Sequence, residues 1–192
     1  MRNWSVTSLL VGALVLSANS VAAQESVSYK VLATNKTSTM QKELQEAGDG
    51  GFRFVAAMGG ETAMGGNEVV VLLERVENDP ARYEYRVLAT SRTSTLQKEL
   101  QQAADAGWLA VGQTVFESTF GGKETAAILE RNPAQPARVR YEYKLIATSK
   151  TSTLAKELQE AAEQGFRAVG LTVGKTAVGG NELVAVTRRP AR

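Results

Sequence analysis

The chain repeats one sequence pattern three times, and this repetition constrains the fold more than any other feature. Each copy continues through Ala-Thr, Thr-Ser-Thr, Lys-Glu-Leu-Gln and a glycine followed by Phe or Trp, and the copies begin at Tyr29, Tyr85 and Tyr143. Regular recurrence of this kind is typical of structural repeats. A single unit of this size, without a disulfide or a metal, buries too little surface to be stable alone. We therefore expect the three copies to share one core.

The beginning of each copy alternates polar and apolar residues, as a half-buried strand does. In the second copy Tyr83, Tyr85 and Val87 alternate with Glu84 and Arg86. The last segment of each copy is apolar on both faces or nearly so, which is typical of a central strand covered on both sides. These segments are residues 68–73, 126–129 and 183–186. We predict strand, helix, strand and strand in each copy, with the third strand inserted antiparallel between the first two.

An amphipathic helix is predicted between the first two strands of each copy. Ser38 with Gln41, and Ser94 with Gln97, have the spacing of a capping box, which predicts that the helix begins there, although Ala155 breaks the box in the third copy. A glycine that can adopt a left-handed conformation then ends each helix, at Gly51, Gly107 and Gly165. The apolar face recurs at i, i+4 and i+7. It consists of Met40, Leu44 and Ala47, of Leu96, Leu100 and Ala103, and of Leu154, Leu158 and Ala161.

The predicted fold class is α+β, with three tandem strand-helix-strand-strand repeats whose sheets are mainly antiparallel and carry one helix each. The helix covers one face of its sheet, and the other face needs a partner. Two arrangements of the units are open: pseudo-threefold packing about a common axis, and joining edge to edge in a longer sheet. We favour the threefold packing.

The N-terminal segment has the pattern of a cleaved secretory signal. Arg2 supplies a positive charge, Leu9–Leu16 form a short apolar core, and small residues end at Ala23, where a signal peptidase would cut. We expect a periplasmic or secreted protein without a membrane-spanning segment in the mature chain, since a spanning helix needs about 20 apolar residues. The predicted divisions are residues 1–23 for the signal, 24–75 for the first repeat, 76–131 for a linker and the second repeat, and 132–192 for a linker, the third repeat and a basic tail.

Three strings in the second copy resemble a widespread bacterial small-domain family that is known only as a domain of unknown function. They are Tyr83–Val87, Ala106–Val111 and the segment from Gly121-Gly122 up to Arg131. Members of that family typically read Tyr-Glu-Tyr-Lys-Val, a Leu-rich helix, Gly-Trp-Glu-Leu-Val and a Gly-rich hairpin. The resemblance implies the strand-helix-strand-strand unit and brings no known catalytic residues. The chain differs in its signal segment, in its three copies, and in having Phe52 and Phe166 where the family often has Trp.

Composition removes most enzyme classes from consideration. The chain has no His and no Cys, which excludes imidazole bases, thiolate nucleophiles and the usual zinc or iron ligands. Its 22 Lys and Arg residues nearly balance 20 Asp and Glu residues, which argues against a nucleic-acid partner. We expect no cofactor and no catalytic residue.

The best cluster of polar side chains precedes the helix in each copy. Helix N-termini present free N–H groups and a partial positive charge, so hydroxyls and one cation there suit a phosphate, sulfate or carboxylate group. The competing interpretation is that the hydroxyls only cap the helix. The candidate ligand-binding residues are Thr34, Lys36, Thr37 and Ser38, with Thr90, Arg92, Thr93 and Ser94, and with Thr148, Lys150, Thr151 and Ser152.

A cation site is a further hypothesis, since Glu68, Glu124 and Glu182 occupy equivalent positions and threefold packing would bring them together. Solvated carboxylates are the ordinary interpretation, and no metal site is predicted. Because active sites need one asymmetric set of groups whereas repeated surfaces suit binding, we expect a non-enzymatic binding protein. Its expected partner is an envelope or extracellular protein that contacts the helix starts or the exposed sheet edges. The alternative is a small anionic ligand held at the helix starts.

Overall fold

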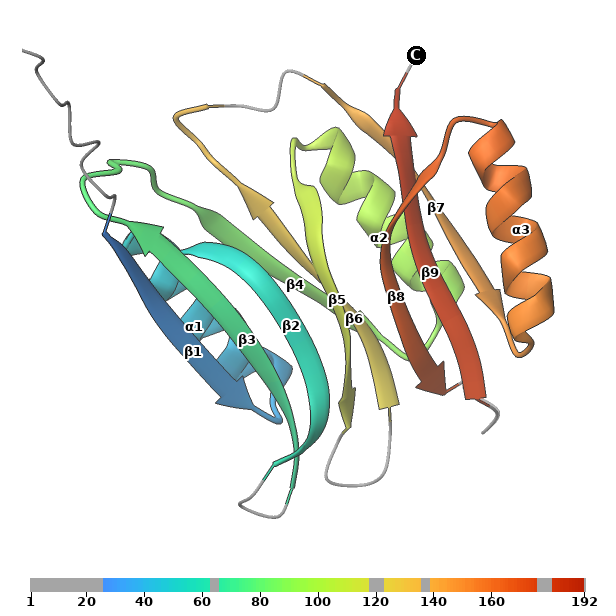
Figure 1. Ribbon diagram of the computed structural model, residues 1–192, viewed down its shortest axis with the longest axis horizontal. Helices are drawn as coiled ribbons and strands as arrows, with labels where there is room; N and C mark the ends of the chain where they lie inside the picture. Colours follow the sequence, from blue (N-terminus) through green and yellow to red (C-terminus); the bar gives the residue numbers. More distant parts are fainter. Residues whose placement is uncertain (1–25, 63–65, 118–122, 136–138, 176–180, 192) are drawn as a thin grey trace, which may run out of the picture.

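A computed structural model describes residues 26–62, 66–117, 123–135, 139–175 and 181–191 (Figure 1). The predicted signal segment lies outside these residues. The first unit contains β1 (Val27–Thr34), α1 (Thr37–Asp49), β2 (Arg53–Thr62) and β3 (Gly66–Val76). The second contains β4 (Glu84–Thr90), α2 (Thr93–Asp105), β5 (Leu109–Glu117) and β6 (Lys123–Arg131), and the third contains β7 (Tyr141–Thr148), α3 (Thr151–Glu163), β8 (Arg167–Lys175) and β9 (Asn181–Pro190).

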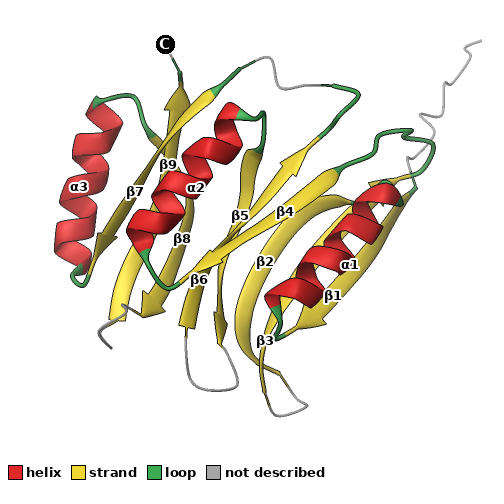
Figure 2. Ribbon diagram, turned by 180° about the vertical axis from the view of Figure 1, so that it is seen from behind, coloured by secondary structure: helices red, strands yellow, loops and turns green. Residues whose placement is uncertain are grey.

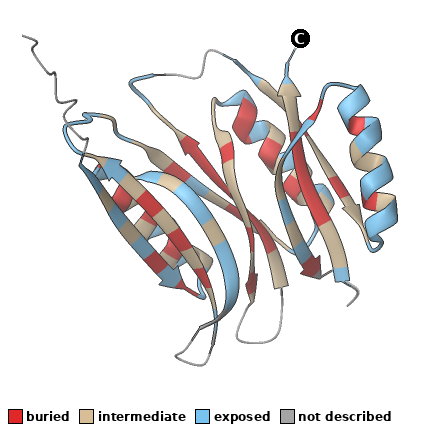
Figure 3. Cartoon of the chain, viewed as in Figure 1, coloured by how far each residue is buried: buried red, intermediate tan, exposed pale blue. Residues whose placement is uncertain are grey.

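Each unit forms one antiparallel sheet with its third strand in the middle, as the sequence predicts. The strand orders are β1-β3-β2, β4-β6-β5 and β7-β9-β8. The middle strands carry much of the core, and in β6 both faces are buried (Figure 3). Ala126 and Ile128 face the core that unit 1 contributes, whereas Ala127 and Leu129 face the core beneath α2. The apolar run of β6 therefore has a separate burial site for each of its faces, whereas β3 buries only the face with Val69, Val71 and Leu73 and leaves the other face half-buried.

The helices end as predicted but do not begin as predicted. Gly51, Gly107 and Gly165 have φ values of 83°, 86° and 85°, the left-handed conformation that closes a helix. At the other end the N-cap residue is basic, Lys36 in α1, and it makes no side-chain capping hydrogen bond. Ser38 lies inside the first turn, so the predicted capping box is wrong. The glutamine that would complete the box contacts the next unit instead.

The three units stand side by side in a row, with their helices on one face (Figures 1 and 2). The row is open: Tyr29 on β1 is 64% exposed, although the equivalent Tyr85 and Tyr143 are 2% and 3% exposed. The threefold packing favoured from the sequence is therefore not found. Neighbouring units share buried residues, since Tyr85 and Ile128 of unit 2 belong to the core of unit 1, but the described residues form three hydrophobic clusters and not the single core expected. No described helix is long and apolar enough to cross a membrane.

Two glutamine side chains on each of the first two helices join neighbouring units. In α1, Gln41 donates to the carbonyl oxygen of Tyr85 (2.8 Å) and accepts from the N–H of Val87 (2.7 Å). Gln45 accepts from the N–H of Tyr85 (3.3 Å). These backbone groups lie on the free edge of β4, where no strand pairs with them. The amides therefore take the place of a neighbouring strand, and we call Gln41 with Gln45, and Gln97 with Gln101, the glutamine pairs.

The second glutamine pair repeats this arrangement at the next junction. Gln97 donates to the carbonyl oxygen of Tyr143 (2.8 Å) and accepts from the N–H of Leu145 (2.6 Å). Gln101 accepts from the N–H of Tyr143 (2.9 Å) and donates to the carbonyl oxygen of Tyr141 (3.3 Å). The same helix-to-edge contact thus builds both junctions.

A buried carboxylate completes the first junction. Glu130 accepts from the backbone N–H of Phe54 (3.3 Å) and from the guanidinium of Arg53 (3.3 Å). The hydroxyl of Tyr85 lies 3.0 Å from both a Glu130 oxygen and the carbonyl oxygen of Phe52, and it donates to one of them at a time. Burial raises the pKa of Tyr85 above its usual value of 10, and the charge of Glu130 raises it further.

We expect Gln97→Ala to lower the free energy of unfolding by about 1–3 kcal/mol, because it leaves a buried N–H and C=O of β7 without partners. Gln102→Ala is the matched control, since Gln102 is an exposed glutamine on the same helix. Urea denaturation of both variants measures the difference. Equal stability of the two would show that the amide contacts do not hold the junction.

Tyr85→Phe is expected to change how stability depends on pH. The folded-state pKa of Tyr85 lies above its unfolded value of 10, so the stability that its neutral hydroxyl contributes is complete below that pH and is lost as the pH rises beyond it. Tyr85→Phe should therefore cost about 1–3 kcal/mol near neutral pH and should reduce the loss of stability above about pH 10. Tyr29→Phe is the control at an exposed position. An unchanged alkaline slope in Tyr85→Phe would contradict the assignment.

Candidate functional site

The structure places the twelve predicted ligand-binding residues at three separate helix starts, spread along the row of units (Figure 2). In each unit a threonine ends the first strand, a basic residue is the N-cap, and the next threonine and serine open the helix. The strand-end hydroxyls accept a local backbone hydrogen bond, for instance Thr34 from the N–H of Lys36 (3.2 Å) and Thr90 from that of Arg92 (3.2 Å). These hydroxyls shape the turn before the helix. The fold does not combine the three clusters into one site.

One of these helix starts already faces an acidic side chain. The hydroxyl of Thr93 donates to a carboxylate oxygen of Glu182 in unit 3 (3.2 Å). A bound anion at this position would meet that negative charge, which offsets the attraction of the helix N-terminus. Anion binding at the Thr-Ser-Thr loops therefore stays a prediction that no contact in the structure favours.

The three equivalent glutamates are likewise not combined into a site. Glu182 contacts Thr93, whereas Glu68 lines a cleft on the sheet side of the molecule. Among the described residues, no group of three or more His, Cys, Asp or Glu side chains is placed to hold a metal ion. The row arrangement explains this, because the glutamates sit in successive units and do not converge on an axis.

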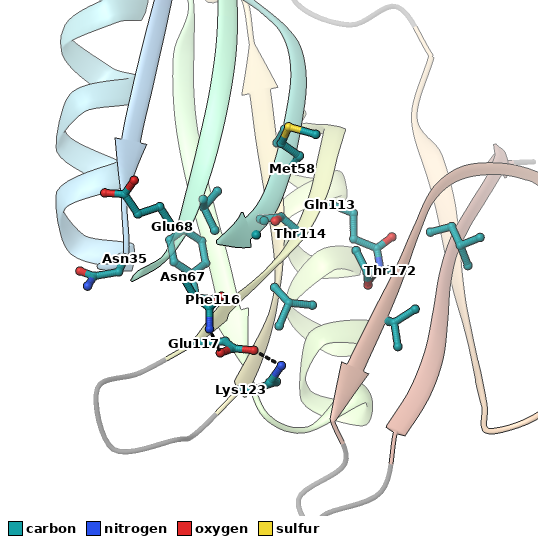
Figure 4. Close-up of a pocket in the computed structure, with 17 residues that line it drawn as sticks. Asn35, Met58, Asn67, Glu68, Gln113, Thr114, Phe116, Glu117, Lys123 and Thr172 are labelled. Carbon is teal, nitrogen blue, oxygen red and sulfur yellow. Dashed lines mark hydrogen bonds and ion pairs between the residues drawn. The ribbon is translucent and has the colours of Figure 1, made fainter. Parts of the chain in front are cut away.

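A cleft of about 520 Å³ draws on all three units and is the candidate site with the most varied lining that we consider (Figure 4). We call it the inter-unit cleft. Its lining comes from the second strand of every unit, with a few residues from neighbouring segments. The lining residues are 57–60 on β2, 113–117 on β5 and 171–173 on β8, with Asn35, Asn67, Glu68, Val69 and Lys123.

The middle of the cleft is polar and is built by β5. Gln113 donates to the hydroxyl of Thr172 (2.8 Å) and to the carbonyl oxygen of Val184 (3.0 Å), which ties β5 to the third unit (Figure 4). Thr114 is 2% exposed, and among the described residues neither its hydroxyl oxygen nor the side-chain oxygen of Gln113 has a hydrogen-bond partner. Buried polar atoms are costly when unpaired, so these two can receive a hydrogen bond from water or from a ligand in the cleft.

The sides of the cleft combine exposed apolar residues with an ion pair. Met58 on β2, and Leu171 and Val173 on β8, are all exposed. Lys123 is paired with Glu117, which also accepts from the side-chain amide of Asn67 (Figure 4). The cleft thus offers apolar surface, amide groups and a neutralised charge pair.

Sequence reasoning missed this cleft because it followed only the residues that the copies share. The decisive positions of the second strands differ between copies: Ala57, Gln113 and Leu171 are equivalent by strand register. A comparison of the copies for such differences would have marked this face. Comparisons of the whole chain with protein-family models, with curated proteins and with solved structures each give no match.

Proposed function

We propose that this protein acts by binding, and that the inter-unit cleft takes an extended segment of another polypeptide. The observation that carries the proposal is the pair of large exposed apolar side chains, Leu171 and Val173, which lie on the same face of β8 in the lining of the cleft. An exposed apolar patch bordered by polar groups is typical of protein interaction sites.

The strands that border the cleft suit an extended ligand. β2 and β8 are edge strands of their sheets, so each has a side that no strand of its own sheet covers. An extended peptide can add to such an edge through main-chain hydrogen bonds while its side chains enter pockets. The amides of Asn35 and Asn67 on the cleft lining can donate to peptide carbonyls and accept from peptide N–H groups.

Binding is favoured over catalysis by the chemistry of the chain. It has no His and no Cys, and the one charge pair in the cleft, Glu117 with Lys123, is already mutually neutralised among the described residues. We infer from the N-terminal pattern that the protein is periplasmic or secreted, and the partner that we propose is therefore an envelope or extracellular protein. A small anionic ligand remains the alternative partner.

A library of displayed unstructured peptides, selected on the purified protein, tests this proposal. Peptides that bind the cleft should lose roughly tenfold to hundredfold in affinity for Val173→Asp, because a carboxylate is then buried against the peptide. Val139→Asp is the matched control, since Val139 is another exposed valine that does not line the cleft. Selection that enriches no peptide, or peptides equally weakened by both substitutions, would reject the cleft as the binding site.

A further inference from the structure

The row of units ends in two different open surfaces. One is formed by the free edge of β1 with Tyr29 and Val31, and by Glu74 on the neighbouring strand β3, and we call it the β1 end. The other is the outer side of the third unit around α3, with Gln159, Ala162 and Arg167, which we call the α3 end. Within the chain, a helix such as α2 is covered by a following first strand, and a first strand such as β7 is covered by a preceding helix.

The β1 end exposes residues whose equivalents in the second and third units are buried at the internal junctions. Tyr29 is 64% exposed, whereas Tyr85 and Tyr143 are almost completely buried under the preceding helix. Val31 is also exposed, although the N–H of its equivalent, Val87, is bonded to Gln41. A tyrosine and a valine exposed on an edge strand form a surface that favours association with another polypeptide.

The α3 end carries the matching helix residues. Gln159 is equivalent to Gln101, which bonds to Tyr143 on the following strand, and it is exposed on α3. Ala162 is exposed as well, whereas its equivalent Ala104 is buried in the core shared with unit 3. The third helix thus presents the face that its counterparts bury.

The two ends carry opposite charges at the positions that form an ion pair at the first junction. At the first junction Arg53, which follows the helix of unit 1, pairs with Glu130 of unit 2 at 3.3 Å. The residue equivalent to Arg53 in the last unit is Arg167, which is exposed. The residue equivalent to Glu130 in the first unit is Glu74, which stands opposite Tyr29 across the β1–β3 ladder as Glu130 stands opposite Tyr85.

We propose that the α3 end of one copy docks on the β1 end of a second copy and continues the row of units from chain to chain. In this contact Gln159 accepts from the N–H of Tyr29, and Arg167 pairs with Glu74. The interface is heterologous, joining unlike surfaces, and it gives a ring where the rotation closes and a filament where it does not.

The proposed contact is weaker than the internal junctions for a reason that the sequence shows. Ala155 occupies the position of Gln41 and Gln97, so the α3 end has one amide where α1 and α2 have two. Because Ala155 has no side-chain amide, the backbone groups of β1 opposite it make no hydrogen bond to α3 in the proposed contact. Association is therefore reversible, whereas the units within a chain stay together.

Light scattering during size-exclusion chromatography, on the chain purified after secretion, tests the proposal. The unmodified protein should show a mass above one chain that falls on dilution. Glu74→Arg and Arg167→Glu should each reduce the association at least tenfold, because each places like charges in the contact. An equimolar mixture of the two variants should associate again, since each supplies the charge that complements the other. Lys98→Glu, which reverses a charge on the exposed side of α2, is the control.

Three results would overturn the proposal: a single-chain mass for the unmodified protein at every concentration, association that neither charge reversal weakens, or variants that do not recover on mixing. A folded state of each variant is verified by circular dichroism. Ala155→Gln provides an independent check, because restoring the second amide should tighten the association roughly tenfold through two added hydrogen bonds. An unchanged or weaker association in that variant would show that α3 does not use the geometry of α1 and α2.

Discussion

The contact between a helix and the free edge of the next first strand is the interaction on which the rest of the structure depends. An edge strand has unpaired N–H and C=O groups, and a helix laid over that edge would bury them at high cost. The glutamine pairs remove this cost, because each amide has both a donor and an acceptor. Residues four apart on a helix rise about 6 Å, and alternate residues on a strand are about 6.8 Å apart. Gln41 and Gln45 therefore match successive backbone positions of β4.

This contact also determines where the core lies. Once α1 rests on β4, the ring of Tyr85 enters the core of unit 1, and its hydroxyl reaches Glu130 and the backbone of Phe52. The apolar interior is thus continuous between neighbouring units. Repeat proteins of this kind derive much of their stability from the interfaces between neighbours. A unit removed from the row would lose part of its core as well as its interface.

The sequence predicts the inside of a unit better than the relation between units. The apolar third strand predicts the strand order, and Gly51 predicts where α1 ends, since both depend on local pattern. The capping box was wrong because Gln41 has the spacing for a local contact but makes a tertiary one. One sign was present: the third copy has Ala155 at the position of Gln41 and Gln97, so the glutamine is not a fixed part of the helix start. Differences between the copies could mark the second strands from the sequence, but the inter-unit cleft itself could not be predicted, because its lining depends on how three second strands approach one another.

The two internal junctions use the same amides but different charges, and this difference has a consequence for the order of the units. Glu130 serves the first junction, whereas the equivalent Arg188 serves the second, where it donates to the carbonyl oxygen of Ala110 (3.3 Å) and lies over the ring of Tyr141. Exchanging the second and third units would bring Arg188 against Arg53 at the first junction, even though Glu130 would then meet Arg167 at the second. The copies are therefore not interchangeable. The order of the units along the chain depends on the charge that each unit presents to the unit before it.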